Sequence, residues 1–271
     1  MIYDCILFYN ELDILDLRLH TLNNSVDKFV IVESTVTFTG NNKKLYFENS
    51  KQLFKKYSDK IIHVIVDDTP SNFTDLPDGE IYNYIKNSTG WNRATEPQWG
   101  REIFQRECIK RALINCLDDD VIIISDCDEI PKLNSSINTN EVNAFIQNMF
   151  YYHINMLGST DWSGSKMLTY NKVKNNSIND IRQGKLTTHI VYDGGWHLTY
   201  MGGVDRIINK LSAYSHTEFN NDVVKNNIKT NIDNNNDILF RSTKMIDVNL
   251  YDYYSVEMID FVKQKYSYLI R

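Results

Sequence analysis

The chain of 271 residues is 42% hydrophobic and 24% charged, a composition typical of an ordinary globular protein with a substantial core. The formal net charge of −6 and the lack of a basic run give no support for a nucleic-acid partner. No apolar stretch approaches the roughly 20 residues of a membrane span, and the N-terminus lacks the basic and apolar regions of a signal peptide.

The first half of the chain alternates between two kinds of apolar pattern. Short apolar runs predict strands at 3–9, 29–32, 61–66 and 121–124. Apolar residues at helical spacing predict helices at 11–22, 52–57 and 99–117. Because strands alternate with helices, we expect an α/β fold with a mostly parallel central sheet flanked by helices.

The pattern changes after residue 131. We expect a helix at 141–147 and then aromatic-rich strands at 150–154, 167–170, 189–192 and 196–201. From Asp205 onward the pattern is mainly helical, and the Asn-rich stretch 220–237 is polar enough for a solvated or partly mobile helix. No change of composition marks a linker, so we expect one domain with a β-rich and helical second half.

The cysteines lie on predicted strands and helices and lack the CxxC spacing of a metal or redox motif: Cys5, Cys108, Cys116 and Cys127. Reduced thiols in the core are the simplest interpretation, and they fit a reducing compartment. We therefore expect a cytoplasmic protein.

The segment 120–131 is the most informative part of the sequence. Four β-branched apolar residues, 121–124, predict a strand buried on both faces, and the carboxylates of Asp126 and Asp128 follow it directly. Ligands of parallel sheets bind at the carboxyl ends of the strands, and a pair of carboxylates there suits Mg²⁺ or Mn²⁺. An ion held by few protein ligands keeps positions open for phosphate oxygens, as an enzyme that handles a nucleotide diphosphate requires. The alternative is a polar turn after a core strand.

Other predicted strands also end in acidic residues, at Glu33 and at Asp67 and Asp68. These strand ends lie on the same edge of the predicted sheet as Asp126, so the carboxylates could line one cleft. Solvated strand ends are the alternative for each, and we favour that alternative for Asp67 and Asp68.

Seven segments, in order along nearly the whole chain, resemble glycosyltransferase family 17: 3–13, 26–34, 60–64, 101–106, 124–131, 195–200 and 215–220. This inverting family contains the bisecting N-acetylglucosaminyltransferases of N-glycan processing. The resemblance implies a GT-A fold, a nucleotide-sugar donor and an inverting transfer. It assigns residues 1–131 to the half that binds the nucleotide sugar and 132–271 to the acceptor side. Animal members carry a membrane anchor that this sequence lacks, which leaves their acceptor in question here.

The resemblance also implies a metal site. Asp128 would ligate Mn²⁺ or Mg²⁺, while Asp126 would reach the ribose or, through water, the ion. A histidine late in the chain often completes the metal site of GT-A enzymes, so His197 and His216 are candidates. A hydrogen-bonded structural histidine is the alternative for each. The cation would stabilise the negative charge of the leaving nucleotide diphosphate.

We expect the nucleotide pocket to be lined by the residues that end the first two strands, namely Phe8, Asn10, Glu11 and Glu33. Glu11 could instead be an acid favoured at a helix N-terminus. Two arginines on the helix before the metal motif, Arg101 and Arg106, could bind the donor phosphates, because a guanidinium pairs well with them. Solvated or salt-bridged arginines are the alternative.

An inverting transfer needs a carboxylate that takes the proton of the acceptor hydroxyl. Asp205 follows Gly202-Gly203 at the start of a predicted helix, where GT-A enzymes often place this base, and Asp193 and Glu129 are further candidates. Asp is also a favoured helix N-cap, so Asp205 has a purely structural interpretation.

The leading hypothesis is a metal-dependent, inverting glycosyltransferase that transfers a sugar, N-acetylglucosamine by resemblance, from a UDP-sugar to a glycan acceptor. A nucleotidyltransferase that makes sugar nucleotides would place a Gly-rich, basic loop after the first strand, where residues 9–12 provide none. A non-catalytic carbohydrate-binding module would not need Asp126 and Asp128 together at a buried strand end.

Overall fold

The structure is a computed structural model and describes residues 1–134 and 136–271. Within these residues, ten strands form one sheet with the order β3-β2-β1-β4-β7-β6-β9-β5, while β10 pairs with β7 and β8 with β6. The strands are β1 (Ile2–Phe8), β2 (Lys28–Ser34), β3 (Ile61–Val66), β4 (Val121–Asp126), β5 (Glu129–Pro131), β6 (Asn143–Tyr151), β7 (Met156–Thr169), β8 (His189–Val191), β9 (Gly195–Thr199) and β10 (Ile246–Asp247).

Helices separate and follow these strands. The α-helices are α1 (Leu12–Leu22), α2 (Tyr46–Ser50), α3 (Glu80–Asn87), α4 (Pro97–Glu107), α5 (Tyr170–Val173), α6 (Ile178–Arg182), α7 (Val204–Ala213), α8 (Asp222–Asp233) and α9 (Val256–Lys265). Short 3₁₀ helices are η1 (Lys51–Tyr57), η2 (Cys108–Ala112), η3 (Thr217–Phe219), η4 (Leu250–Asp252) and η5 (Ser267–Leu269).

The four strands predicted in the first half form the parallel part of the sheet. β1 pairs in parallel with β2 on one side and with β4 on the other, and β3 extends the sheet beyond β2. The chain order therefore reverses at β1 and β4, and open α/β sheets bind ligands at the carboxyl ends of strands beside such a reversal. Parallel pairs continue on the far side, where β6 pairs with β8 and β9, although β7 is antiparallel to its neighbours.

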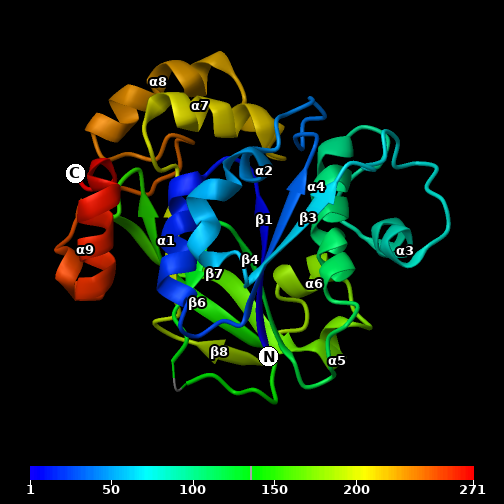
Figure 1. Cartoon of the computed structure of the whole chain (residues 1–271). Coiled ribbons are helices and arrows are strands. Elements are labelled where there is room, and N and C mark those ends of the chain that lie inside the picture. The colour runs from blue at the N-terminus through cyan, green and yellow to red at the C-terminus, as the bar shows by residue number, and fades with distance from the viewer. Residues whose placement is uncertain (135) are drawn as a thin grey trace.

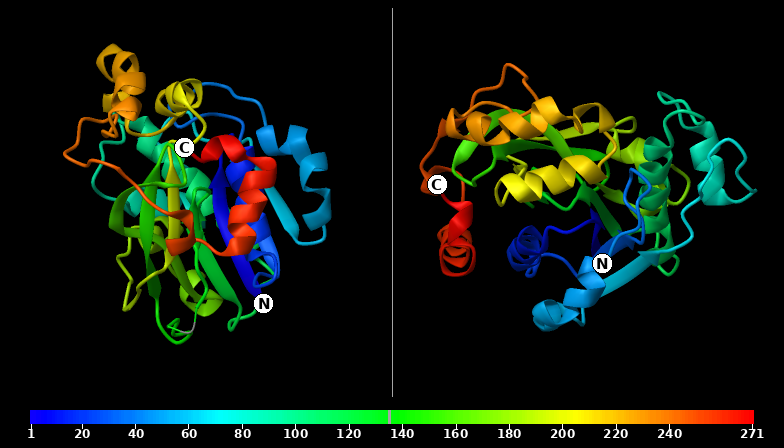
Figure 2. Two further views of the ribbon diagram at one scale, coloured as in Figure 1. Left: turned by 90° about the vertical axis from the view of Figure 1, so that its left-hand side faces the viewer. Right: turned by 90° about the horizontal axis from the view of Figure 1, so that it is seen from above.

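Helices cover both faces of the sheet, because its central strands are apolar on both sides. Ile6 of β1 faces the core formed with α1 and α9, whereas its neighbour Leu7 faces the core formed with α4. Helices α1 and α9 lie side by side (Figure 2), and the rings of His20 and Phe261 stack at 4.0 Å between them.

Helices α7 and α8 lie across the end of the sheet toward which β1 points (Figure 1). They bury Ile207, Leu211 and Ile228 against apolar residues of β6 and β7, such as Met149 and Met156. The second half of the chain thereby reaches the sheet edge where the carboxylates of β4 lie.

The expected α/β fold, with a large, mostly parallel sheet flanked by helices, is confirmed, and it is consistent with the GT-A type. The helix predicted at 141–147 is wrong, because this segment forms most of strand β6. Its polar residues Asn143 and Gln147 are buried, so polarity there does not mark a solvated helix face. The single helix predicted at 99–117 is α4 followed by the short η2, and that predicted at 52–57 is the 3₁₀ helix η1.

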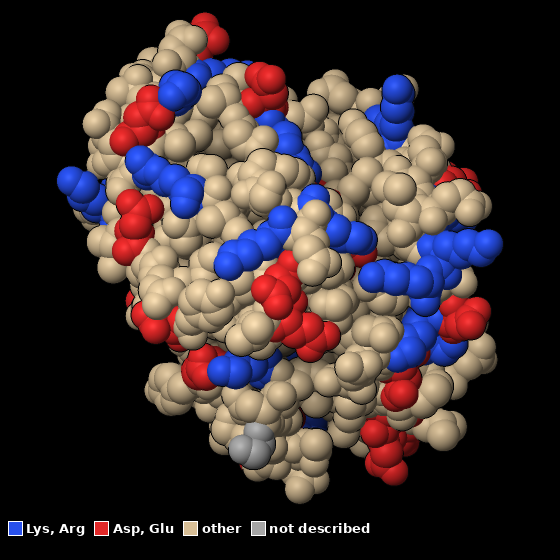
Figure 3. Space-filling model, turned by 60° about the vertical axis from the view of Figure 1, so that its left-hand side comes forward, with Lys and Arg blue, Asp and Glu red and all other residues tan. Residues whose placement is uncertain are grey.

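The surface shows no long run of one charge on the face in Figure 3, where Lys and Arg side chains are interspersed with Asp and Glu. A nucleic-acid backbone would require a continuous basic track, which this face does not offer. Among the described residues, no helix has the length and apolar character needed to cross a lipid bilayer.

Candidate active site

A cleft of about 720 Å³ opens at the carboxyl ends of β1 and β4. Of the site residues predicted from the sequence, those that line it are Phe8, Glu11, Arg106, Asp126, Asp128, Glu129, His197 and His216. The sequence therefore brings the strand-end carboxylates, one arginine and both histidines to a single cavity.

The side chain of Arg18, in α1, holds the loop that carries Asp126 and Asp128. The Arg18 side chain is 0% exposed, and its Nε and Nη2 donate to the Asp4 carboxylate at 2.7 and 2.6 Å. Its Nη1 donates to the backbone carbonyls of Asp126, Cys127 and Glu129, of which the last lies at 2.6 Å. A guanidinium has five N–H donors, so a buried arginine can supply hydrogen bonds to the backbone carbonyls of a turn in this way. Arg18 therefore fixes the backbone of the site.

Asp126 lies between two arginines from different helices. Its Oδ1 accepts from Nη2 of Arg106 at 3.1 Å, and its Oδ2 accepts from Nη2 of Arg182 at 3.0 Å. Burial raises the pKa of the Asp126 carboxyl, but the two guanidiniums outweigh it and lower the pKa to about 2. Asp126 is therefore ionised at neutral pH.

Arg182 reaches this position because α4 holds the start of α6. The buried Glu107 of α4 accepts from the backbone N–H groups of Ile178 and Asn179 at 3.1 and 3.0 Å, and Ser177 donates to it through its hydroxyl. Burial raises the pKa of Glu107, although these hydrogen bonds oppose the rise. Asn179 in turn accepts from Arg106, so both arginines belong to one connected network.

Glu129 is fully buried beside this network. Its carboxylate accepts from Trp162 Nε1 at 2.7 Å, from the backbone N–H of Asp126 at 3.1 Å, and from Arg182. Both oxygens are thus engaged by the protein, which suits a positioning residue better than a proton acceptor.

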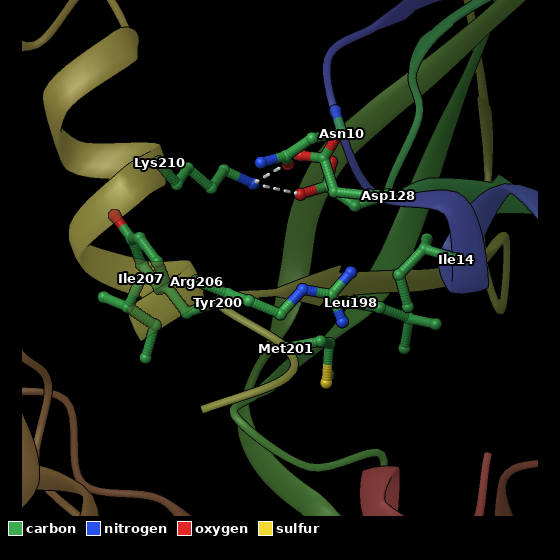
Figure 4. A pocket seen from close by; sticks show the side chains of 10 residues that line it. Asn10, Ile14, Asp128, Leu198, Tyr200, Met201, Arg206, Ile207 and Lys210 are labelled. Carbon is green, nitrogen blue, oxygen red and sulfur yellow. Dashed lines mark hydrogen bonds and ion pairs between the residues drawn. The ribbon is translucent and has the colours of Figure 1, made fainter. Parts of the chain in front are cut away.

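Asp128 contacts two side chains of the second half of the chain. Its Oδ2 accepts from Lys210 Nζ of α7 at 2.7 Å (Figure 4). Its Oδ1 lies 3.6 Å from Nε2 of His197 in β9. Burial opposes the ionised form, but Lys210 and His197 outweigh it and hold the pKa of Asp128 well below its usual value. Burial likewise lowers the pKa of Lys210, while Asp128 and Glu11 raise it above its usual range.

His197 comes close to Asp128 because β9 packs unusually tightly on β5. Gly195 has φ of +116°, and a Cβ at this position would lie 2.2 Å from the carbonyl oxygen of Ile130. Only glycine permits that approach. Two residues further on, His197 lies opposite Glu129, and its buried Nδ1 has no hydrogen-bond partner among the described residues.

The residues present fit a divalent cation of the kind expected from the sequence. A carboxylate oxygen of Asp128 and a ring nitrogen of His197 face each other, whereas the other Asp128 oxygen is paired with the Lys210 ammonium. Within residues 1–134 and 136–271 no three His, Cys, Asp or Glu side chains gather around one point. Such a sparse protein ligand set is usual for Mg²⁺, which takes its other ligands from phosphate and water. Metal dependence stays a prediction.

A smaller pocket of about 20 Å³ adjoins the cleft behind Asp128, and Asn10, Glu11, Arg206 and Lys210 line it (Figure 4). Asn10 donates to the Asn209 side chain of α7 at 3.2 Å rather than projecting into the main cleft. Glu11 lies at the boundary, where its Oε1 is 3.7 Å from Lys210 Nζ.

Glu33 does not line the cleft. Its side chain is 0% exposed, accepts from the backbone N–H of Phe47 at 3.1 Å, and lies 3.2 Å from His63 Nε2 and 3.7 Å from Lys43 Nζ. Lys43 does line the cleft, between the rings of Tyr9 and Tyr46. Glu33 therefore acts on the cleft by positioning Lys43.

Arg101 and His216 also lie apart from the carboxylates. Arg101 donates to the carbonyl of Phe38 at 3.0 Å and does not line the cleft. His216 lies on an aromatic wall with Trp99 and Tyr214, where its Nδ1 is 2.8 Å from Glu218 Oε1.

Two of the three candidates for the catalytic base lie outside the cleft. Asp205 is exposed in the first turn of α7, and the residue that caps this helix is Gly203. Asp193 is exposed and pairs with Lys132. The third candidate, Glu129, lines the cleft, but both of its carboxylate oxygens already accept hydrogen bonds from the protein. Apart from Asp126, Asp128 and Glu129, the carboxylates in the cleft lining are Glu11 and Glu102, each 19% exposed.

Sequence reasoning did not find Arg18, Lys43, Arg182 or Lys210. Arg182 and Lys210 lie on short helices, more than 50 positions from the carboxylates that they contact. Trp162 lines the cleft, whereas Trp196 is buried in the core and donates to the Tyr253 carbonyl.

Comparisons with known proteins agree with the resemblance. The family model described as glycosyltransferase family 17 matches residues 1–264. A human protein named beta-1,4-mannosyl-glycoprotein 4-beta-N-acetylglucosaminyltransferase is 32% identical over 124 residues, which are 45% of this chain and 20% of the human protein. The rat protein of the same name matches equally well. The matched segment thus spans about a fifth of the length of these relatives.

Two more distant similarities extend beyond animals. An uncharacterized protein of Methanocaldococcus jannaschii is 32% identical over 87 residues, which are 32% of this chain and 17% of that protein. Among solved structures, 2-C-methyl-D-erythritol 4-phosphate cytidylyltransferase of Francisella tularensis covers 79% of this chain, and all of that chain is matched. Its TM-score of 0.38 and 8% identity are too low to bear on fold or activity.

Proposed function

This chain belongs to glycosyltransferase family 17, and we propose that it transfers a sugar from a nucleotide-sugar donor to a glycan acceptor. The proposed donor is UDP-N-acetylglucosamine, because the mammalian relatives are named as N-acetylglucosaminyltransferases. The proposed transfer inverts the configuration of the sugar, as the sequence resemblance implies.

The observation that carries this proposal is the position of Asp126 and Asp128 at the sheet edge where chain order reverses, open to a cleft of about 720 Å³. That volume falls within the usual range for small-molecule sites. The cleft contains cationic side chains next to the carboxylates, as a site for a diphosphate requires, and aromatic side chains on its walls.

In this proposal Phe8 and Lys43 contact the nucleoside end of the donor, because Phe8 ends β1 and Lys43 lines the cleft from the connection between β2 and α2. Arg106 and Arg182 hold Asp126 ionised and oriented toward the donor. Trp162, fixed by its hydrogen bond to Glu129, offers an apolar ring face to a sugar.

Asp128 and His197 would hold a divalent cation, and this cation would supply positive charge to the departing diphosphate. Lys210 adds a second positive charge at the same carboxylate. Because the fold fixes Arg106 and Arg182 beside Asp126 before the donor arrives, their positive charges need little reorganisation as charge develops.

The proton of the acceptor hydroxyl needs a carboxylate with an oxygen open to the cleft. Glu11 and Glu102 are the candidates in the lining outside the Asp126–Glu129 loop. Glu102 is paired with Arg106 at 2.9 Å and accepts the Ser215 hydroxyl, so both glutamates would have to exchange a present partner for the acceptor.

A titration calorimetry series tests the proposal directly. Purified protein is titrated with UDP, CDP and GDP, each with Mn²⁺ and with chelator, and donor hydrolysis is then followed with UDP-N-acetylglucosamine and UDP-glucose. We expect selective UDP binding and slow release of N-acetylglucosamine. Asp128→Asn should weaken both, whereas Asp193→Asn, which removes an exposed carboxylate outside the cleft, should change neither. Failure of UDP to bind under either condition would exclude the proposed donor.

A further inference from the structure

The Lys210 ammonium is already paired with Asp128, the carboxylate that is proposed to hold the divalent cation. Its Nζ lies 2.7 Å from Asp128 Oδ2, a contact drawn in Figure 4, and 3.7 Å from Glu11 Oε1. We propose that Lys210 competes with the divalent cation for Asp128, so that the cation binds well only after the donor diphosphate has attracted the Lys210 ammonium. This inference rests on the proposed function and deepens it.

The Lys210 ammonium is held near Asp128 by the position of its helix. Ile207 and Leu211, on either side of it in sequence, are buried in the core under α7. Arg206 forms two hydrogen bonds to the Asp13 carboxylate, with Nη2 at 2.7 Å from Oδ1, which attaches α7 to α1. The backbone at Lys210 is therefore fixed, while its four-carbon side chain can still turn toward a neighbouring acceptor.

The electrostatics of the unliganded pocket disfavour a second cation. Asp128 and Glu11 supply two negative charges, and Lys210 neutralises one of them, so a divalent ion beside the ammonium would experience direct repulsion. In a site shielded from water, like charges a few ångströms apart interact strongly. An ion can therefore take Asp128 only if Lys210 finds another partner.

The donor diphosphate would be that partner. Its oxygens offer acceptors to the ammonium of Lys210 and ligands to the divalent ion at the same time. Lys210 has three N–H donors, and among the described residues only Asp128 lies within hydrogen-bond distance of them. Donor and cation would then bind cooperatively, and by linkage each would strengthen the binding of the other by the same factor.

Cation binding can be measured without turnover, because the electron paramagnetic resonance signal of aqueous Mn²⁺ falls when the ion is bound. Mn²⁺ affinity is measured with and without UDP for the wild type, Lys210→Met and Lys210→Arg. The matched control is Lys229→Met on α8, because Lys229 forms a pair of the same 2.7 Å length with Asp233 but is well exposed. Circular dichroism confirms that each variant is folded.

Without UDP, Lys210→Met should bind Mn²⁺ roughly tenfold more tightly than the wild type, within the usual range of coupling between two sites. Adding UDP should improve Mn²⁺ binding less in this variant than in the wild type. Lys210→Arg keeps the positive charge and should stay as weak as the wild type without UDP, and Lys229→Met should match the wild type throughout.

Equal or weaker Mn²⁺ binding by Lys210→Met in the absence of UDP would overturn the competition. The same holds if Lys210→Arg gains affinity as Lys210→Met does, because the charge would then not be the cause. If UDP binds but no variant binds Mn²⁺, both the competition and the metal part of the proposed function are wrong. If UDP does not bind at all, the proposed donor itself fails.

Discussion

Arg18 and Asp4 form a fully buried ion pair beneath the cleft, with Nη2 and Oδ1 2.6 Å apart. The pair joins the first helix to the first strand, and the remaining Arg18 nitrogen donates to carbonyls of the loop that carries Asp126 and Asp128. A single side chain therefore connects the stability of the core with the shape of the site.

Arg18→Met should lower the free energy of unfolding by about 3 kcal/mol or more, because it leaves the Asp4 carboxylate buried without a partner. Urea denaturation followed by fluorescence measures the loss. Arg111→Met is the matched control, since Arg111 pairs with the exposed Asp68 and should cost at most about 1 kcal/mol. A similar small loss in both variants would show that Arg18 does not hold the core.

Acid should destabilise the protein in a definite pH range. The pKa of Asp126 is lowered from 3.8 to about 2, so its ionised form is favoured in the folded state. A lowered pKa contributes stability that is present above the unfolded value and lost as pH falls toward the folded one. Part of the stability should therefore disappear between about pH 4 and 2, as measured by urea denaturation at several pH values. In Asp126→Asn the fall across this range should be shallower, and an identical slope would contradict the assignment.

Two variants separate the roles of Glu33 and Lys43. Lys43→Met should raise the KM for the donor with kcat nearly unchanged, because a contact with the nucleoside end is made in ground and transition states alike. Glu33→Gln weakens the hold on Lys43 from a fully buried position, so it should cost about 1–3 kcal/mol of stability as well as raising KM. Thermal melting and steady-state kinetics on the same samples test both. A donor KM that is unchanged in Lys43→Met would place Lys43 outside the donor site.

The proton acceptor can be sought among the glutamates of the cleft lining. Glu11→Gln and Glu102→Gln keep side-chain size but cannot take a proton. In the one that removes the base, transfer should fall by roughly 10²-fold or more while UDP binding is retained. Initial rates and calorimetry distinguish this from lost donor binding. If neither variant lowers transfer, the base lies elsewhere than in these two residues.

Asp205→Asn should be nearly silent. The Asp205 side chain is exposed in the first turn of α7, so it can favour the helix only through the dipole, by about 0.3–1 kcal/mol. Turnover near the wild-type rate, together with a small change in melting temperature, is the expected result. A large loss of turnover with normal stability would instead restore Asp205 as the base and would require α7 to move.

The sequence predicts the parallel half of this fold well because its strands are short runs of mostly apolar residues. The wrong helix prediction at 141–147 has a physical cause. β6 is a central strand, and its buried side chains Asn143 and Gln147 form hydrogen bonds within the sheet. Polar residues at such positions imitate the exposed face of a helix.

The residues of the site likewise divide into those that the sequence predicts and those that it does not. Asp126 and Asp128 are predictable because the strand that positions them is local in sequence. Arg182 and Lys210, their partners, are recognisable only after the chain has folded, since nothing in their own neighbourhoods differs from any surface helix. Glu33 illustrates the limit: its place at a strand end predicts a residue that lines the nucleotide pocket, but in the structure it is buried behind Lys43 and accepts from the backbone of α2.

The attachment of α7 to α1 also affects the order in which parts of the structure form during folding. Asp13 accepts hydrogen bonds from Arg206 and from Tyr268, which lie 193 and 255 positions further along the chain. Contacts between such distant positions form late in folding, because the loops that they close are long. We therefore expect a folding intermediate that contains the finished parallel strands but has no Lys210 at Asp128. In that species Asp128 would lack the Lys210 ammonium, so the sheet would form before the cleft is complete.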